Sequence, residues 1–308
     1  MINRSRLVLI SLFVLAGVAQ AQFAFTTNNG AITITGYSGS NDPVVIPDYT
    51  NGYPVTAIGN VAFYFASVTN LVMGSNVVSV GNYAFESCGN LTNIVFDDHL
   101  GNIGLGAFQN CFKLARVVLP ANVTNLDVSS FRSCTSLITV NIPNSVANIR
   151  DEAFYYDTAL TSVTIGSGVT NIGYSAFYGC NNLTAIYFKG NAPTTNMTPF
   201  GVNTTIYYLP GSSGWSSPFG GRPAILWNPE AQVGDGNFGV QNNQFGFNIT
   251  GSSNLVVVVE ASGDLGSSTW LPVATNQLNT FVGTNGTSYF SDALWANHPN
   301  RYYRFRSP

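Results

Sequence analysis

The chain is 308 residues long, which is enough for two ordinary domains or for one domain and an elongated repeat array. Hydrophobic residues make up 45% of it, so a large core can be buried, whereas only 8% is charged, against about a quarter in a typical soluble domain. The net charge of −3 provides no basic patch of the kind that nucleic acid requires, so no nucleic-acid partner is expected.

The first 21 residues have the composition of a secretory signal peptide. Two arginines precede an apolar run over residues 7–18, and small residues follow at a cleavage position that ends in Ala21. The run is shorter than the roughly 20 apolar residues that span a bilayer. We therefore predict cleavage after Ala21, a secreted or cell-surface protein, and no membrane span in the mature chain.

Residues 22–57 precede the repeated part of the chain. They contain an alternating segment from Ala31 to Thr35 and an apolar segment that ends at Pro47. Alternation of this kind is typical of a strand with one buried face. We predict that these residues form an N-terminal capping rung.

A repeat of about 23 residues occupies residues 58–189. Six phenylalanines recur at steps of 22, 23, 23, 23 and 23 residues, each at the end of a segment such as residues 172–177 (IGYSAF). They are Phe63, Phe85, Phe108, Phe131, Phe154 and Phe177. A chance hydrophobic pattern would not keep this register, so the segment predicts a stack of similar rungs.

Other apolar columns keep step with the phenylalanines. A leucine lies six residues after each of the last five, and aliphatic or aromatic residues follow at nine and eleven, as at Val140 and Ile142. This alternation indicates a short strand with one buried face. A single rung cannot bury its own apolar side chains, whereas stacked rungs share a continuous core. We therefore predict a β-rich solenoid of short strands and turns.

The four cysteines occupy one column, three residues after a repeat phenylalanine: Cys88, Cys111, Cys134 and Cys180, with Asp157 at the equivalent place in another rung. Neighbouring rungs could bring two Cα atoms within bridging reach, about 5 Å. Three cysteines lie on consecutive rungs and the fourth two rungs away, so regular pairing is impossible. We predict free, buried thiols, and no zinc site, because no histidine accompanies the column.

The outward-facing residues of the predicted strands form the candidate ligand-binding surface. Most lie eight and ten residues after a repeat phenylalanine, in a strip that is small, flat and nearly uncharged. They are Asn70, Asn93, Val95, Arg116, Thr139, Asn141, Ser162, Thr164 and Tyr187. A second strip lies one residue after each repeat phenylalanine and includes Tyr64, Tyr155 and Tyr178. Its tyrosines could contact sugars or could be ordinary, partly buried turn residues.

The repeat fades after residue 189. Residues 190–228 contain Pro193, Pro199 and Pro210 and Gly- and Ser-rich turns, and we predict an irregular C-terminal cap. In residues 229–308, strand-like segments are separated by Gly, Ser and Asn turns. This part predicts a small all-β, sandwich-like module.

The repeat resembles the bacterial BspA-like leucine-rich repeat, in which Leu, an aliphatic pair and Pro precede Ile-Gly-x-x-Ala-Phe-x-x-Cys. Residues 140–143 (VNIP) and 172–180 (IGYSAFYGC) carry the resemblance. Departures occur at Asp127 and Arg150, where Gly is expected, and at Ser130, where Ala is. The resemblance implies a leucine-rich-repeat solenoid in a surface protein that binds other proteins or cells, without common catalytic residues.

Together these observations predict a secreted, non-catalytic recognition or adhesion protein that binds an extracellular protein or polysaccharide through the solenoid surface. The two histidines, His99 and His298, have no recognisable nucleophile or orienting partner in the sequence, and no cofactor or metal is expected. Two alternatives remain. One is a structural envelope or matrix component without a defined ligand, and the other is an accessory protein of polysaccharide degradation.

Overall fold

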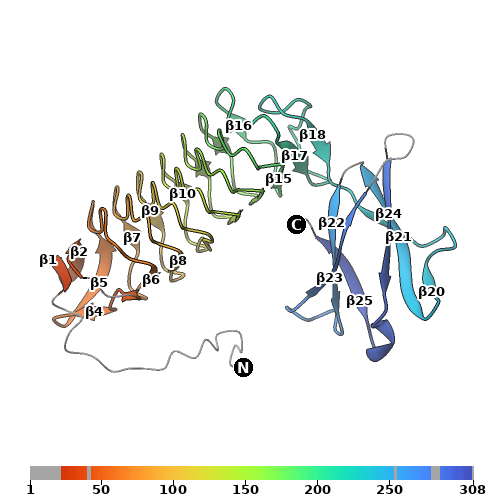
Figure 1. Ribbon diagram of the computed structural model, residues 1–308, viewed down its shortest axis with the longest axis horizontal. Coiled ribbons are helices and arrows are strands. Elements are labelled where there is room, and N and C mark those ends of the chain that lie inside the picture. The colour runs from red at the N-terminus through yellow and green to blue at the C-terminus, as the bar shows by residue number, and fades with distance from the viewer. Residues whose placement is uncertain (1–21, 40–42, 253–254, 279–284, 307–308) are drawn as a thin grey trace.

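The computed structural model describes residues 22–39, 43–252, 255–278 and 285–306. The predicted signal peptide, residues 1–21, lies outside the described residues. The chain forms a long solenoid followed by a small β module (Figure 1). In the part of the chain that the structure describes, no helix is long and apolar enough to cross a membrane.

The larger sheet runs the length of the solenoid. From β2 onward its strands pair in parallel, each with the strand of the next rung, as Ile149 pairs with Ile172. Its strands are β1 (Phe23–Asn28), β2 (Ala31–Tyr37), β5 (Tyr53–Ile58), β7 (Ser79–Val80), β9 (Asn102–Ile103), β10 (Asn125–Leu126), β12 (Asn148–Ile149), β14 (Asn171–Ile172) and β16 (Thr194–Thr195). The short strand β4 (Tyr49–Thr50) pairs with β5. The prediction of a β-rich solenoid is confirmed.

A second ladder lies on another face of the solenoid and carries the candidate binding surface; we call it the strand face. It is divided into two parallel sheets. The first contains β3 (Val44–Val45), β6 (Asn70–Val72) and β8 (Asn93–Val95). The second contains β11 (Thr139–Ile142), β13 (Ser162–Ile165), β15 (Ala185–Phe188), β17 (Thr205–Tyr208) and β18 (Ala224–Leu226).

The core is a stack of identical side chains. All six repeat phenylalanines are at most 1% exposed, and neighbouring rings lie 4.7–5.6 Å apart with nearly parallel planes. Tyr37 of β2 continues the stack at its N-terminal end, 4.9 Å from the ring of Phe63. Residues 22–57 thus supply the first rung of both ladders.

The cysteines form a second buried column. All four are free, and each thiol donates a hydrogen bond to the backbone carbonyl of the repeat phenylalanine in the preceding rung, as from Cys88 to Phe63 at 3.1 Å and from Cys180 to Phe154 at 3.0 Å. Burial raises the pKa of the Cys88 thiol to about 12. These thiols therefore act as small core side chains that also satisfy a backbone acceptor.

Asp157 is the exception in this column. Its carboxyl is fully buried; Oδ1 accepts the backbone N–H of Cys134 at 2.8 Å, and Oδ2 has no hydrogen-bond partner among the described residues. Burial raises the pKa of Asp157 well above its ordinary value. An unsatisfied buried polar atom is destabilising, so Asp157 costs the fold stability that a cysteine in the same place would not.

The solenoid continues one rung beyond its predicted end at residue 189. β17 pairs in parallel with β15, and Phe200 stacks on Phe177 at 6.1 Å, 23 residues after it. Residues 190–228 are thus more regular than the irregular cap that we predicted. Pro199 stands where the repeat has Ala, which hid the register. Beyond this rung, Trp215 covers Phe188, with 4.8 Å between ring centroids.

The remaining chain forms an all-β module, as predicted. One sheet contains β19 (Glu230–Gln232), β20 (Gly239–Gln241), β21 (Gln244–Ser252) and β24 (Asn285–Asp292), and the other contains β22 (Val256–Ser262), β23 (Leu271–Gln277) and β25 (Tyr302–Arg306). All pairs are antiparallel. A single turn of 3-10 helix, η2 (Trp295–Asn297), precedes β25. The two sheets share an apolar core that includes Phe247, Val257 and Phe290.

The module packs against the C-terminal end of the strand face. Tyr187 of β15 and Tyr207 of β17 belong to the same apolar cluster as Phe247 and Val257 of the module. The indole N–H of Trp227 donates to the carbonyl of Val256 at 3.4 Å. In Figure 1 the sheet of β22 and β25 faces the solenoid. The module therefore closes one end of the strand face.

We expect Phe108→Ala to lower the free energy of unfolding by about 3–5 kcal/mol, because a cavity in the middle of the ring stack cannot close. Urea denaturation measures the change. Phe112→Ala is the matched control, since Phe112 lies on the same rung but is 48% exposed, and it should cost far less. Equal losses from both variants would contradict the stacked core.

We expect Asp157→Cys to raise the free energy of unfolding at pH 7 by about 1–3 kcal/mol, since it removes the unsatisfied carboxyl oxygen. The pKa of Asp157 is higher in the folded state than in the unfolded state, where it is about 4. The carboxyl therefore destabilises the fold least below pH 4, and the free energy of unfolding falls as the pH rises from there toward the folded-state pKa.

Urea denaturation of both proteins at pH 4 and pH 7 measures this effect. In Asp157→Cys, the fall in the free energy of unfolding between pH 4 and pH 7 that Asp157 causes should disappear. The reverse change, Cys111→Asp, should destabilise the protein. An unchanged pH dependence in Asp157→Cys would show that the carboxyl is not buried in this column.

Candidate binding surface

The predicted surface residues form a row along the strand face. In-register pairing places Asn70 beside Asn93 and Thr139 beside Ser162, although the members of each pair are 23 residues apart. Asn93, Val95, Arg116, Thr139 and Asn141 are exposed, and Asn70, Ser162 and Thr164 are half-buried. Eight of the nine predicted residues therefore lie together on one accessible surface.

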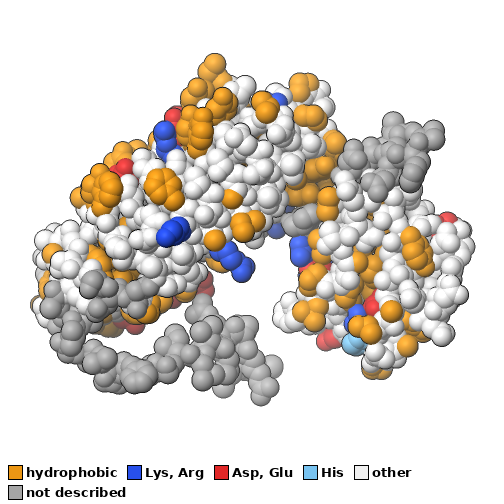
Figure 2. Space-filling model, viewed as in Figure 1, with side chains coloured by type: hydrophobic (Ala, Val, Ile, Leu, Met, Phe, Trp, Pro, Cys, Tyr) orange, Lys and Arg blue, Asp and Glu red, His pale blue; other side chains and the backbone are white. Residues whose placement is uncertain are grey.

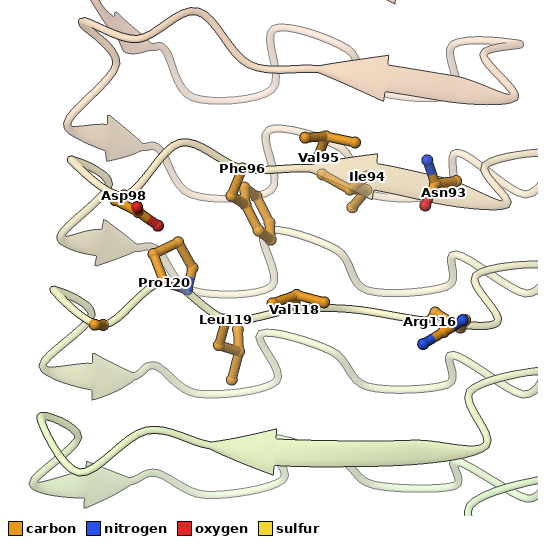
Figure 3. Close-up of a pocket in the computed structure, with 10 residues that line it drawn as sticks. Asn93, Ile94, Val95, Phe96, Asp98, Arg116, Val118, Leu119 and Pro120 are labelled. Atoms are coloured by element: carbon orange, nitrogen blue, oxygen red, sulfur yellow. The ribbon is translucent and has the colours of Figure 1, made fainter. Parts of the chain in front are cut away.

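The ladder is interrupted in the middle of this surface. β8 is the last strand of the first sheet, and it is joined to the rung that follows only by a bridge between Asn93 and Arg116. The described residues 117–119 of that rung belong to no strand. A hollow of about 370 Å³ lies at this interruption. Figure 3 shows Asn93 and Arg116 at one end of it and Asp98 at the other.

The hollow has an apolar floor and a polar rim. Val95 and Val118 lie between its two ends (Figure 3), and their side chains are 49% and 74% exposed. Arg116 brings a cation and Asp98 an anion to the rim. An apolar centre with polar groups around it is the arrangement found in protein interfaces.

Tyr187 does not belong to the accessible row, and our prediction is wrong for this residue. Its side chain points outward from β15, but it is only 5% exposed. It stacks on Tyr207 at 5.1 Å and packs into the apolar cluster of the module. Burial, and to a smaller extent the neighbouring Tyr207, raises the pKa of its hydroxyl. The accessible row therefore ends at Thr164.

The module contributes one basic side chain, Arg306, to the end of the row. A second hollow, of about 330 Å³, is lined by strand-face residues such as Asn141 and Thr164 and by Lys189 and Arg306. Burial alone would raise the pKa of Glu260, but hydrogen bonds from Arg306 and Arg304 outweigh it and hold that pKa below its ordinary value. Two arginines thus share one carboxylate, which leaves this end of the surface positive.

The described residues contain no group of three or more His, Cys, Asp or Glu side chains that could hold a metal ion. His99 is exposed in a loop, where its Nδ1 lies 2.6 Å from Oδ1 of Asp97. The absence of cofactors and of catalysis stays a prediction from the sequence.

Comparison with known proteins identifies the repeat. The pattern of the BspA type leucine rich repeat region matches residues 56–184 in six copies. The crystal structure of a leucine-rich repeat protein from T. pallidum is 30% identical, covers 61% of this chain and 84% of its own, and superposes with a TM-score of 0.53. The chain belongs to the BspA-type leucine-rich repeat family.

Two further solved structures show lower similarity. A leucine-rich repeat protein from Bacteroides ovatus is 23% identical, with coverage of 62% of this chain and 60% of that one and a TM-score of 0.49. A leucine rich cell surface protein from Faecalibacterium prausnitzii is 29% identical, with coverage of 56% and 54% and a TM-score of 0.44. None of the curated proteins compared with the chain matches it.

Two features of this BspA-type protein escaped sequence reasoning. Residues 116–119 (RVVL) keep the apolar alternation of their neighbours, so nothing in the sequence marks the interruption of the ladder there. The burial of Tyr187 depends on a module whose strands begin more than 40 residues later, at Glu230. Phe200, by contrast, could have been found, because it keeps the 23-residue step.

Proposed function

We propose that this BspA-type leucine-rich repeat protein acts outside the cytoplasm as a recognition or adhesion protein. It binds an extracellular protein or polysaccharide through the accessible strand face between Asn70 and Thr164. The observation that carries this proposal is the hollow at the interruption of the ladder, where Val118 is 74% exposed between polar ends.

The chemistry of the hollow supports contact with a ligand. A large apolar side chain that remains exposed leaves apolar surface in water, and a ligand that covers it gains the free energy of burying that surface. Arg116 at the rim is of a residue type that is enriched among the energetically important contacts of interfaces. The rest of the row consists of Asn, Ser and Thr side chains, which can hydrogen-bond to peptide groups or to sugar hydroxyls.

The location of the protein is a separate part of the proposal. It rests on the composition of residues 1–21, with basic, apolar and small residues in the order of a signal peptide. The family to which the repeat belongs is consistent with a place at the cell surface. A structural matrix component would also lie outside the cytoplasm, but it would bind no ligand at the hollow.

We expect Val118→Glu to weaken binding at least about tenfold, because a buried carboxylate would replace an apolar contact. Wild-type protein is first tested on an array of immobilised matrix proteins and glycans, and the variant is then titrated against whatever binds. The control is Val202→Glu, since Val202 is also 74% exposed but lies outside the row.

Wild-type affinity in Val118→Glu would rule out the hollow as the binding site. If wild-type protein binds nothing on the array, the structural alternative is favoured over recognition.

A further inference from the structure

The turns that follow the repeat phenylalanines share an unusual backbone conformation. The second residue after each phenylalanine has a positive φ, between 57° and 78°. The residues are Phe65, Ser87, Asn110, Ser133, Tyr156 and Gly179. In this conformation the backbone N–H donates to a carbonyl of the next rung, as from Tyr156 to Tyr178 at 2.9 Å. The left-handed conformation is therefore imposed by the stacking of the rungs.

Tyr156 is poorly suited to this position. Glycine and asparagine adopt a left-handed conformation readily, whereas a bulky side chain there is a genuine outlier. Such a residue costs of order 1–3 kcal/mol, and Tyr156 remains 44% exposed. Phe65 is strained in the same way on the first rung, so the strain alone does not mark the site, and the surroundings of Tyr156 decide.

The next rung leaves space for the Tyr156 ring. A Cβ atom on Gly179 would lie 2.7 Å from Cδ2 of Tyr156 and 3.0 Å from its Cγ and Cε2, so no other residue type fits beside the ring as it stands. Three near-equal distances to adjacent ring atoms show that one face of the ring lies over the glycine. The glycine therefore leaves room for the ring in this orientation at the surface.

Tyr156 is part of a tyrosine patch, which we define as Tyr155, Tyr156 and Tyr178. The ring centroids of Tyr155 and Tyr156 are 4.6 Å apart, and those of Tyr155 and Tyr178 are 5.9 Å apart on adjacent rungs. Tyr178 is 45% exposed. Figure 2 shows hydrophobic side chains at several places along the upper edge of the solenoid, with other side chains between them.

The charges in contact with the patch compensate each other. The guanidinium of Arg132 lies over the ring of Tyr155, 4.7 Å from its centroid, and forms an ion pair with Glu152. The patch therefore offers aromatic rings and hydroxyl groups with no net charge to attract an ionic ligand.

We propose that the tyrosine patch binds a neutral polysaccharide chain. One face of a sugar ring carries C–H groups of positive partial charge, which pack favourably on the negative face of an aromatic ring. The tyrosine hydroxyls supply donors and acceptors for the sugar hydroxyls. This site is separate from the strand face and does not rest on the function proposed above.

The test uses the whole mature protein and three soluble neutral polysaccharides, a β-glucan, a galactomannan and an α-glucan, each incorporated in a native gel to measure retardation. Tyr156→Gly removes the ring and also relieves the backbone strain. We expect it to melt at the same temperature as wild type or higher, and to bind about tenfold more weakly. Tyr156→Phe keeps the ring and should keep binding within about threefold.

Phe65→Ser is the matched control, because it removes an exposed ring from the same column four rungs away. It should bind the polysaccharide like wild type, and so should Val118→Glu, which tests the strand face. The proposal is overturned if none of the three polysaccharides retards wild type, or if Tyr156→Gly is retarded as strongly as wild type. It is also overturned if only a polyanion such as polygalacturonate is bound, or if the patch proves to bind a protein instead.

Discussion

Every part of the solenoid depends on one constraint, which is that each rung must pair in register with a copy of itself. Backbone groups of one rung bond to the next at the spacing of neighbouring strands, about 4.8 Å, so each side chain lies against its equivalents above and below. Phenylalanine rings tolerate this well, with centroids 5.2 Å apart between Phe85 and Phe108. Like charges would repel in the same position, which explains a chain with only 8% charged residues.

This in-register pairing of rungs generates the two candidate binding surfaces. On the strand face, pairing arranges short polar side chains in a row, and the interrupted ladder at residues 117–119 exposes Val118 within it. In the turns after the repeat phenylalanines, pairing holds the second residue in a left-handed conformation and so fixes where the Tyr156 ring stands. The C-terminal module limits the first surface, because it covers Tyr187 and Tyr207.

The parts of the structure that could be predicted are those that repeat. The 23-residue step reveals the solenoid, the ring stack and the cysteine column, because each is required many times over. Features that occur once leave no such pattern. The outward direction of Tyr187 follows from strand alternation, but its burial depends on contacts with a distant module. The left-handed conformation in the turns could have been predicted, because Asn110 and Gly179, whose residue types favour it, occupy the same column as Tyr156.

Two neighbouring residues of one rung, Tyr156 and Asp157, each lower the stability of the fold. They differ in whether their side chains are accessible to a ligand. Tyr156 is strained and Asp157 is buried with an unsatisfied oxygen, so we expect glycine at the first position and cysteine at the second to be more stable. The rungs on both sides hold this rung in register, so the repeat array can tolerate both costs. Asp157 is fully buried and offers a ligand nothing, whereas Tyr156 presents an oriented ring to solvent. Of these two residues only Tyr156 places a group where a partner can reach it, and the binding site that we propose gives a physical reason for a tyrosine there.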